Sequence, residues 1–332
     1  MAESKSGLNI VAVGGGTGLA TLLSGLKQFV KGSSERPEIA DLSAIVAVSD
    51  DGGSSGRLRD ELQMPPPGDI RNCMVALSED SHLLSRLFRH RFSGDGPLAG
   101  HSFGNLFLAA LSEITGDFAE AVKLSSEVLA SKGHIYPATD SDVRIAAELT
   151  DGSVVRGETN IGRLGSKIRR LYLEPDNCLP MSAALVAIKK AHVITVGPGS
   201  LFTSLLPPLL VKGVSQAIED SKAVKIFVCN LMTQPGETDG LTARRHLEIV
   251  REYTRLNFDL LFVNSQPITA RQSELYQIEG AEQIGVHGSM RDETIEGASV
   301  VRADLLSDGD MVRHDSFKLA RAILSSCHNH GS

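Results

Sequence analysis

The chain has 332 residues, of which 42% are hydrophobic and 22% charged, values typical of a folded, soluble protein. Its formal net charge of −7 gives no support to a general attraction to nucleic acid or to an anionic membrane. No apolar run approaches the roughly 20 residues that cross a bilayer, and the start lacks the regions of a signal peptide. We therefore expect a cytoplasmic protein that neither binds nucleic acid nor inserts into a membrane.

The first predicted element is a strand at residues 8–13, LNIVAV, followed by GGGTG and by leucines at helical spacing. Gly15, Gly16, Thr17 and Gly18 would let backbone amides approach a phosphate at the amino end of this helix. The loop is not a P-loop, since no Gly-Lys-Ser/Thr follows, and it departs from the dinucleotide fingerprint. The alternative is a tight strand-to-helix turn that needs positive φ.

A second apolar run at residues 43–49 leads into the polar stretch 49–72, SDDGGSSGRLRDELQMPPPGDIRN, which we interpret as a functional loop. Asp50 and Asp51 end the strand. Acids in this place can hold ribose hydroxyls, or can hold Mg²⁺ while a substrate phosphate completes its shell. The alternative is an Asx turn that opens the glycine-rich segment.

Three prolines then stiffen the chain before Asp69, Arg71 and Asn72. Arg71 could pair with a phosphate, or it could form a salt bridge with Asp69 or Asp60. Both interpretations stay open at this point.

The segment GHSFGNLFLAAL places His101, Ser102 and Asn105 at the start of an apolar helix. His101 and Ser102 suggest a nucleophile pair, yet adjacent side chains rarely face each other and no orienting acid is evident. We favour capping of the helix by Ser102, with His101 and Asn105 turned toward a ligand.

Residues 134–175 have a different pattern. Two β-rich stretches flank Asp151-Gly152, a strong hairpin signal, so we predict a β-rich insertion at about 134–175. No repeat, low-complexity segment or linker is evident elsewhere. The sequence therefore predicts a single α/β domain over residues 1–332 that carries this insertion.

Three further buried strands are predicted at residues 192–196, 224–229 and 258–263. The first is followed by Gly197, Pro198, Gly199 and Ser200, a second glycine loop before a helical segment. Two such loops on one edge of a sheet could share a diphosphate.

The strand at 224–229 is followed by NLMTQPGETDG, in which Asn230, Thr233, Gln234 and Thr238 are neutral hydrogen-bonding residues. Such side chains suit the recognition of a base or a sugar. The alternative is a purely structural loop.

The chain ends with a predicted helix that carries Phe317, Ala320, Ile323 and Leu324 on one face, preceded by Arg-His-Asp. Strands without polar alternation, separated by helical segments, are typical of a parallel sheet covered on both faces. In such sheets the polar loops at the carboxyl ends of the strands lie on one rim, where ligands bind.

The four cysteines, Cys73, Cys178, Cys229 and Cys327, are far apart and form no C-x-x-C pair. The sequence therefore predicts neither a zinc site nor a disulfide framework, and no metal ligands are assigned.

The motifs GGGTG, SDDGGSSGRLR, PPGDIRN, GHSFGNL, GPGSLFTSLLP, NLMTQPGETDG and a terminal RHD together resemble the YvcK family of bacterial gluconeogenesis factors, within the CofD-like superfamily. The resemblance covers the chain from about residue 9 to about residue 325. It implies a Rossmann-like core, a mostly parallel sheet with helices on both faces, and a cytoplasmic regulator required for cell shape and cell-wall precursor supply under gluconeogenic growth. It also implies binding of UDP-N-acetylglucosamine without demonstrated catalysis.

The enzymatic branch of this superfamily transfers phospholactate from a guanylated donor to a deazaflavin. The chain shares with it the glycine loop and Asp50 and Asp51, whereas GHSFGNL and NLMTQPGETDG follow the regulators. A 2-phospholactate transferase acting with a divalent metal is therefore the alternative function. We expect no required cofactor and leave open Mg²⁺ that accompanies a bound nucleotide. The expected partners are UDP-N-acetylglucosamine or a related nucleotide and a cell-wall or central-carbon enzyme, and homo-oligomerisation is left open.

The terminal motif matches Arg313, His314 and Asp315, and Arg313 is expected to fold back onto the rim and grip a diphosphate. The competing interpretation is a surface ion pair with Asp310 or Asp315. The predicted nucleotide-sugar site has no catalytic residue and comprises Gly15, Gly16, Thr17, Gly18, Asp50, Asp51, Asn72, His101, Asn105, Gly197, Pro198, Gly199, Ser200, Asn230, Thr233, Gln234 and Arg313.

Overall fold

A computed structural model of the chain describes residues 7–31, 38–79, 82–162, 164, 168–285 and 293–330. Its main sheet has eight strands, and all neighbouring pairs run parallel except β10 and β11. In sheet order the strands are β10 (Thr294–Ile295), β11 (Ala298–Ala303), β9 (Leu260–Asn264), β8 (Val224–Val228), β7 (Val193–Val196), β1 (Leu8–Gly14), β2 (Ile39–Val46) and β3 (His134–Pro137).

The central strands are buried on both faces. Every residue of β7 and β9 is buried, as are the last five residues of β1 and of β2. Continuous apolar runs of this kind need a layer of helices on each side. The predicted fold class, a mostly parallel sheet with helices on both faces and a small β-hairpin excursion, is therefore confirmed.

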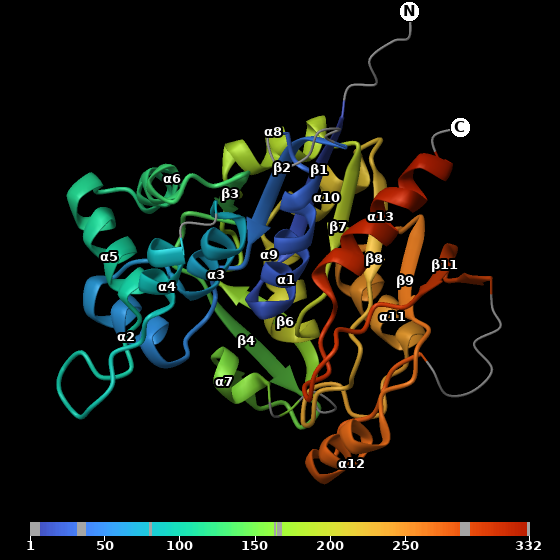
Figure 1. Cartoon of the computed structure of the whole chain (residues 1–332). Coiled ribbons are helices and arrows are strands. Elements are labelled where there is room, and N and C mark those ends of the chain that lie inside the picture. The colour runs from blue at the N-terminus through green and yellow to red at the C-terminus, as the bar shows by residue number, and fades with distance from the viewer. Residues whose placement is uncertain are drawn as a thin grey trace, which may run out of the picture.

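Two helical layers cover the sheet (Figure 1). In the view of the figure, α1 (Gly16–Leu26), α3 (Gly68–Leu77) and α13 (Ser316–His330) lie on the near face, where α1 contacts both of the others. The opposite layer contains α8 (Ser182–Lys190), α9 (Leu206–Leu210), α10 (Val214–Glu219) and α11 (Ala243–Thr254). Short η1 (Lys27–Phe29) continues α1, and η3 (Leu201–Leu205) leads into α9.

Four more helices extend the molecule beyond β3 (Figure 1): α2 (Gly53–Leu62), α4 (His82–Arg89), α5 (Phe103–Thr115) and α6 (Phe118–Val128). The interpretation of residues 49–72 as a loop is thus wrong, because the stretch contains α2 and the start of α3. The buried side of α2 includes Ser54, Ser55 and Gly56. Small residues of this kind carry no apolar periodicity, so the usual helix signal is missing from the sequence.

The β-rich insertion forms a separate antiparallel sheet in the order β5 (Val154–Arg156), β4 (Arg144–Leu149) and β6 (Ile168–Glu174). The hairpin at Asp151-Gly152 is confirmed, with Gly152 at φ 85°. The segment 134–137, which the sequence assigned to the insertion, instead forms β3 and pairs with β2. Figure 1 shows β4, α7 (Glu158–Ile161) and α12 (Ala270–Glu279) on the side of the main sheet to which its strands point.

The strand order reverses between β1 and β7: β2 and β3 follow on one side of β1, and β8, β9 and β11 on the other. Such a switch point leaves a crevice at the carboxyl ends of the two strands. The two predicted glycine loops follow β1 and β7. No helix in the described ranges is long and apolar enough to span a bilayer.

Candidate functional site

The two glycine loops touch at the switch point. A Cβ built on Gly18 would overlap the carbonyl group of Pro198 and lie 3.0 Å from the backbone nitrogen of Gly199. Only a glycine lets the first turn of α1 approach the β7 loop this closely. The prediction that the polar loops share one rim is confirmed.

A cavity of about 580 Å³, which we call the rim cavity, opens beside this contact. Nine of the predicted site residues line it: Thr17, Gly18, Pro198, Gly199, Ser200, Asn230, Thr233, Gln234 and Arg313. The backbone amides of Thr17 and Gly18 belong to the first turn of α1, which has no preceding turn to accept them. The rim cavity therefore presents amide donors at the positive end of a helix.

Side chains of the loop after β8 hold the glycine loop after β7 in place through hydrogen bonds. The Asn230 side chain accepts from the Gly199 amide at 3.0 Å and donates to the Gly199 carbonyl at 2.8 Å. Gln234 Nε2 donates to Ser200 Oγ at 2.8 Å. Thr233 Oγ1 accepts from the Glu282 amide at 2.8 Å. These side chains use hydrogen bonds to shape the loops, as the structural alternative for this segment expects.

Glu237, which the sequence analysis did not single out, is 4% exposed and also lines the rim cavity. Its Oε1 accepts from the Phe202 amide at 2.9 Å. Burial raises the pKa of the carboxyl, and hydrogen bonds from Phe202, Ser200 and Thr203 oppose that rise. Glu237 thus satisfies the amides where η3 begins.

Arg313 is exposed at the mouth of the rim cavity. Its Nη2 lies 3.5 Å from Met311 Sδ, and in the described part of the chain it pairs with no carboxylate. Asp310 pairs instead with Arg271 at 3.5 Å, and Asp315 accepts from the Lys318 amide at 2.7 Å. The ion-pair alternative for Arg313 is therefore wrong.

His314, next to Arg313, is a second residue that the sequence analysis left without a role of its own. Burial lowers the pKa of its imidazole to about 4, so the ring is neutral at pH 7. Its Nε2 is buried without a hydrogen-bond partner. A neutral ring adds no charge to the mouth of the rim cavity, where Arg313 stands as a cation.

Gly15 and Gly16 face away from the rim cavity, toward a group of acids. The Gly16 amide donates to the carboxyl of Asp69, whose Oδ2 would lie 2.5 Å from a Cβ on Gly15. Burial, and next the charge of Asp50, raise the pKa of Asp69 to about 7. From the sequence, Asp69 is a candidate only for a salt bridge with Arg71, since no local pattern indicates its contact with the glycine loop.

Glu158, at the start of α7, completes this group. Burial, and then the charges of Asp50, Asp69 and Asp51, raise the pKa of Glu158 to about 9. Glu158 lies in the insertion, more than 80 residues from Asp69 in the chain, so sequence spacing could not bring the two together. We refer to Asp50, Asp51, Asp69 and Glu158 as the acidic cluster.

Asp50 and Asp51 of the acidic cluster accept hydrogen bonds from backbone amides. Asp50 Oδ1 accepts from the Gly52 amide at 2.8 Å, the bond that an Asx turn requires. Asp51 Oδ1 accepts from the amide of Thr159 at 3.1 Å and from its hydroxyl at 3.2 Å, which ties the rim to α7. In the described part of the chain, no three His, Cys, Asp or Glu residues are arranged to hold a metal ion.

His101, Ser102 and Asn105 lie at the start of α5 or just before it. Ser102 caps α5 by accepting from the Asn105 amide at 3.3 Å, which confirms the predicted cap. His101 Nδ1 lies 2.9 Å from Ser54 Oγ, and Asn105 Nδ2 donates to Ser54 Oγ at 3.1 Å. Burial, and next the charge of Arg57, lower the pKa of His101. His101 therefore contacts Ser54 and not Ser102.

Asn72 accepts from Arg71 Nη2 at 2.7 Å. Of the two interpretations left open for Arg71, the salt bridge with Asp69 or Asp60 does not form in the described ranges: Asp60 pairs with Arg144, and Asp69 attracts Arg71 without a salt bridge. Gly197 donates its amide to the Val13 carbonyl at 3.2 Å. None of Asn72, His101, Asn105 and Gly197 is among the residues that line the rim cavity.

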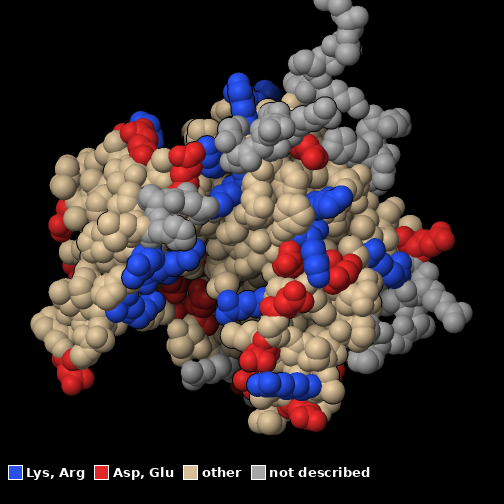
Figure 2. Space-filling model, viewed as in Figure 1, with Lys and Arg blue, Asp and Glu red and all other residues tan. Residues whose placement is uncertain are grey.

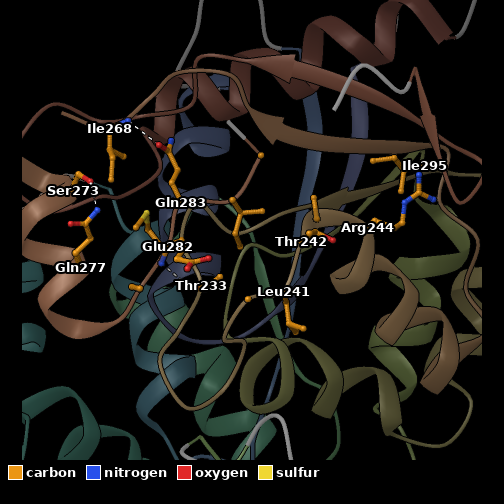
Figure 3. A pocket seen from close by; sticks show the side chains of 16 residues that line it. Thr233, Leu241, Thr242, Arg244, Ile268, Ser273, Gln277, Glu282, Gln283 and Ile295 are labelled. Atoms are coloured by element: carbon orange, nitrogen blue, oxygen red, sulfur yellow. Dashed lines mark hydrogen bonds between the residues drawn. The ribbon is translucent and has the colours of Figure 1, made fainter. Parts of the chain in front are cut away.

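A second cavity, of about 680 Å³, shares Met232, Thr233 and Ala281 with the rim cavity. Figure 3 shows it between the start of α11, with Thr242 and Arg244, and α12 with Gln277. Arg244, the arginine that lines it, pairs with Glu296 at 3.2 Å, so its charge already has a partner. It is therefore a weaker candidate for an anionic ligand than the rim cavity.

A Rossmann-like sheet with two glycine loops and an acidic cluster at its switch point defines a CofD-like α/β protein. In agreement, the family model described as "2-phospho-L-lactate transferase CofD" matches residues 10–306. Within that class, the chain belongs to the gluconeogenesis factors. It is 44% identical to the gluconeogenesis factor of Halalkalibacterium halodurans over 317 residues, which are 95% of each chain.

A second relative, the gluconeogenesis factor of Bacillus subtilis, is 42% identical and is matched over 95% of this chain and 96% of its own length. A crystal structure of a UPF0052 family member from Bacillus halodurans superimposes with a TM-score of 0.89 at 44% identity, covering 96% of this chain and 99% of that one. The family and the fold expected from the sequence motifs are both confirmed.

Proposed function

We propose that this gluconeogenesis factor is a cytoplasmic regulator that binds UDP-N-acetylglucosamine in the rim cavity. Its output would be the control of cell shape and of cell-wall precursor supply during gluconeogenic growth, through a cell-wall or central-carbon enzyme. The relatives named gluconeogenesis factor support the link to gluconeogenic growth.

The observation that carries the proposal is the position of Arg313. In the described part of the chain its guanidinium pairs with no carboxylate, and it stands at the mouth of a cavity whose inner wall is the first turn of α1. A guanidinium keeps its charge at every physiological pH and can bind two phosphate oxygens at once. A diphosphate between Arg313 and the amides of Thr17 and Gly18 would be held from both ends.

The volume and the polarity of the rim cavity fit a nucleotide sugar. A volume of about 580 Å³ lies in the range of roughly 300–1,000 Å³ found for small-molecule sites. The neutral His314 and the hydroxyl of Tyr276, another lining residue, offer hydrogen-bonding groups without charge. Such groups suit a uridine or an N-acetylated sugar.

Calorimetric titration with UDP-N-acetylglucosamine tests this proposal. Replacing Arg313 by Ala should weaken binding by roughly 2 kcal/mol, about 30-fold, because a charged partner is lost from a partly desolvated site. Arg313→Lys should recover part of the affinity, since it keeps the charge without the planar fork. Arg321→Ala removes an exposed arginine of α13 and serves as the matched control. An Arg313→Ala protein that binds within about twofold of the wild type would refute the proposed site.

The same titration, repeated with Mg²⁺, tests whether the cation binds only together with the nucleotide. Mg²⁺ usually keeps several waters and binds through one or two carboxylates together with substrate phosphates, so the phosphate oxygens of the nucleotide would complete its shell. We expect Mg²⁺ alone to give no heat of binding. A 1:1 isotherm for Mg²⁺ without nucleotide would contradict this expectation.

Product analysis separates the regulator from the transferase alternative. Incubation with a guanylated phospholactate donor and a deazaflavin acceptor should yield no coupled product. Turnover that is lost in Asp51→Asn would favour the transferase. The shared family model alone does not decide between them, because related folds carry different functions.

A further inference from the structure

A group of arginines lies on the side of the acidic cluster opposite the rim cavity. Figure 2 shows Lys and Arg gathered between α2 and α4, beside a hollow with acidic side chains on its floor. The members that the contacts bring together are Arg57 of α2, Arg71 of α3 and Arg91, which follows α4; we call them the arginine wall. Arg89 stands near Arg71 as a fourth cation.

Backbone carbonyls hold two of these arginines close together. Arg57 Nη2 donates to the Ala99 carbonyl at 2.6 Å, and Arg91 Nη1 donates to the carbonyl of the next residue, Gly100. Because the two acceptors are consecutive, the two guanidinium groups face the same stretch of chain. Each guanidinium has five N–H donors, so most remain available for another partner.

Arg71 forms the inner end of the arginine wall. Its Nη2 donates to Asn72 Oδ1 at 2.7 Å, while its Nε is buried without a partner. Burial, and next the charge of Arg91, lower the pKa of Arg71, which places the two cations near each other. A buried donor without a partner costs free energy, and a bound acceptor would remove that cost.

Among the residues that the structure describes, neutral oxygens, and not carboxylates, accept the hydrogen bonds of these three arginines. Eight other arginines pair with carboxylates in the described ranges: Arg59, Arg144, Arg156, Arg169, Arg244, Arg245, Arg251 and Arg271. In the same ranges Arg57, Arg71 and Arg91 donate only to neutral oxygens. The charges of Asp69 and Asp50 attract Arg71. In the described ranges, however, none of the three arginines forms a salt bridge, so their remaining donors can bind an added anion.

We infer that the arginine wall binds the phosphoryl group of a small anionic metabolite, at a site separate from the rim cavity. Phosphate oxygens match the planar, paired donors of arginine. The carboxylates of Asp50 and Asp69 lie between the two sites and would keep the two anions apart. The protein would then hold two ligands, one on each side of the acidic cluster.

Inorganic pyrophosphate is a suitable probe, titrated calorimetrically into the full chain at low ionic strength. The wild type should bind it, and Arg57→Gln and Arg91→Gln should each weaken binding about tenfold, the effect of losing one charged hydrogen bond. Arg169→Gln on β6 also removes one exposed arginine and should leave the affinity within twofold. Thermal unfolding of each variant checks that the fold is kept, and Arg71→Lys tests the inner end without removing its charge.

Competition distinguishes this site from the rim cavity. Because the rim cavity could itself take a diphosphate, pyrophosphate is titrated with saturating UDP-N-acetylglucosamine present, and it should still bind. Complete loss of pyrophosphate binding under these conditions, or an undiminished affinity in the Arg57→Gln, Arg91→Gln double variant, would overturn the inference. So would the absence of any pyrophosphate binding at millimolar concentration. Failure of UDP-N-acetylglucosamine to bind, with these pyrophosphate results intact, would refute only the proposed function.

Discussion

Asp69 is predicted to destabilise the folded protein at neutral and alkaline pH. Its carboxyl has a pKa of about 7 in the fold against 3.8 in its ordinary state, because burial and the charge of Asp50 oppose ionisation. Between pH 4 and 7 the native state therefore binds more protons than the unfolded state. The free energy of unfolding falls as the pH rises through this window, and the loss is complete above pH 7.

The magnitude follows from the size of the shift. A rise of about 3 units corresponds to roughly 4 kcal/mol at about 1.4 kcal/mol per unit. Asp69 keeps some contact with solvent, so we expect Asp69→Asn to gain roughly 2 to 4 kcal/mol at pH 8. The asparagine Oδ1 can still accept from the Gly16 amide, which preserves the one bond that favours the native side chain.

Urea denaturation at pH 4 and pH 8 measures this effect. The gain should be largest at pH 8 and close to zero at pH 4, where the carboxyl is protonated in the fold. Asp95→Asn, at an exposed position, removes the same charge and should change the free energy of unfolding little at either pH. An Asp69→Asn protein that is less stable than the wild type at pH 8 would refute the reasoning, because the Gly16 amide and Arg71 would then stabilise the carboxylate more than burial and Asp50 destabilise it.

Two substitutions probe the packing around the site, both by urea denaturation. Gly25→Ala should lower the free energy of unfolding by about 1–3 kcal/mol, because the added Cβ would overlap the Ser316 carbonyl where α1 meets α13. The control Gly96→Ala, with no atom within 4 Å of its Cβ, should change the free energy of unfolding little. Equal losses in the two variants would show that α1 and α13 separate easily. Glu237→Ala should cost about 1–3 kcal/mol by leaving the Phe202 amide without its acceptor, and Glu237→Gln should cost less than Ala does. A Gln variant as unstable as the Ala variant would mean that the negative charge itself is required.

The sheet and its rim could be predicted because their signals are local. A parallel strand buried on both faces is an apolar run such as residues 193–196, and a glycine loop after it is visible in the sequence. The cap at Ser102 was equally accessible, since an N-cap acts within three residues. Each of these predictions depended on neighbours along the chain.

The features that the sequence did not reveal depend on distant partners. The side chain of Asn230 forms two hydrogen bonds with the backbone of Gly199, 31 residues away. The sequence had presented Asn230 as a ligand-binding residue. Glu158 meets the acidic cluster only because the insertion folds back over the rim. Helix α2 was hidden because its buried positions include serine and glycine. In each case tertiary contacts, and not local pattern, assign the role.

Both edges of the main sheet are poorly suited to self-association by sheet extension. At one edge β10 has only two residues, Thr294–Ile295, and runs antiparallel to β11. At the other, β3 has four residues and ends in Pro137, which has no amide to donate to an added strand. Short edges and prolines are means by which proteins avoid adding a strand from a second copy. If this protein forms a homo-oligomer, its subunits should therefore meet through helices or loops and not through a continuous intermolecular sheet.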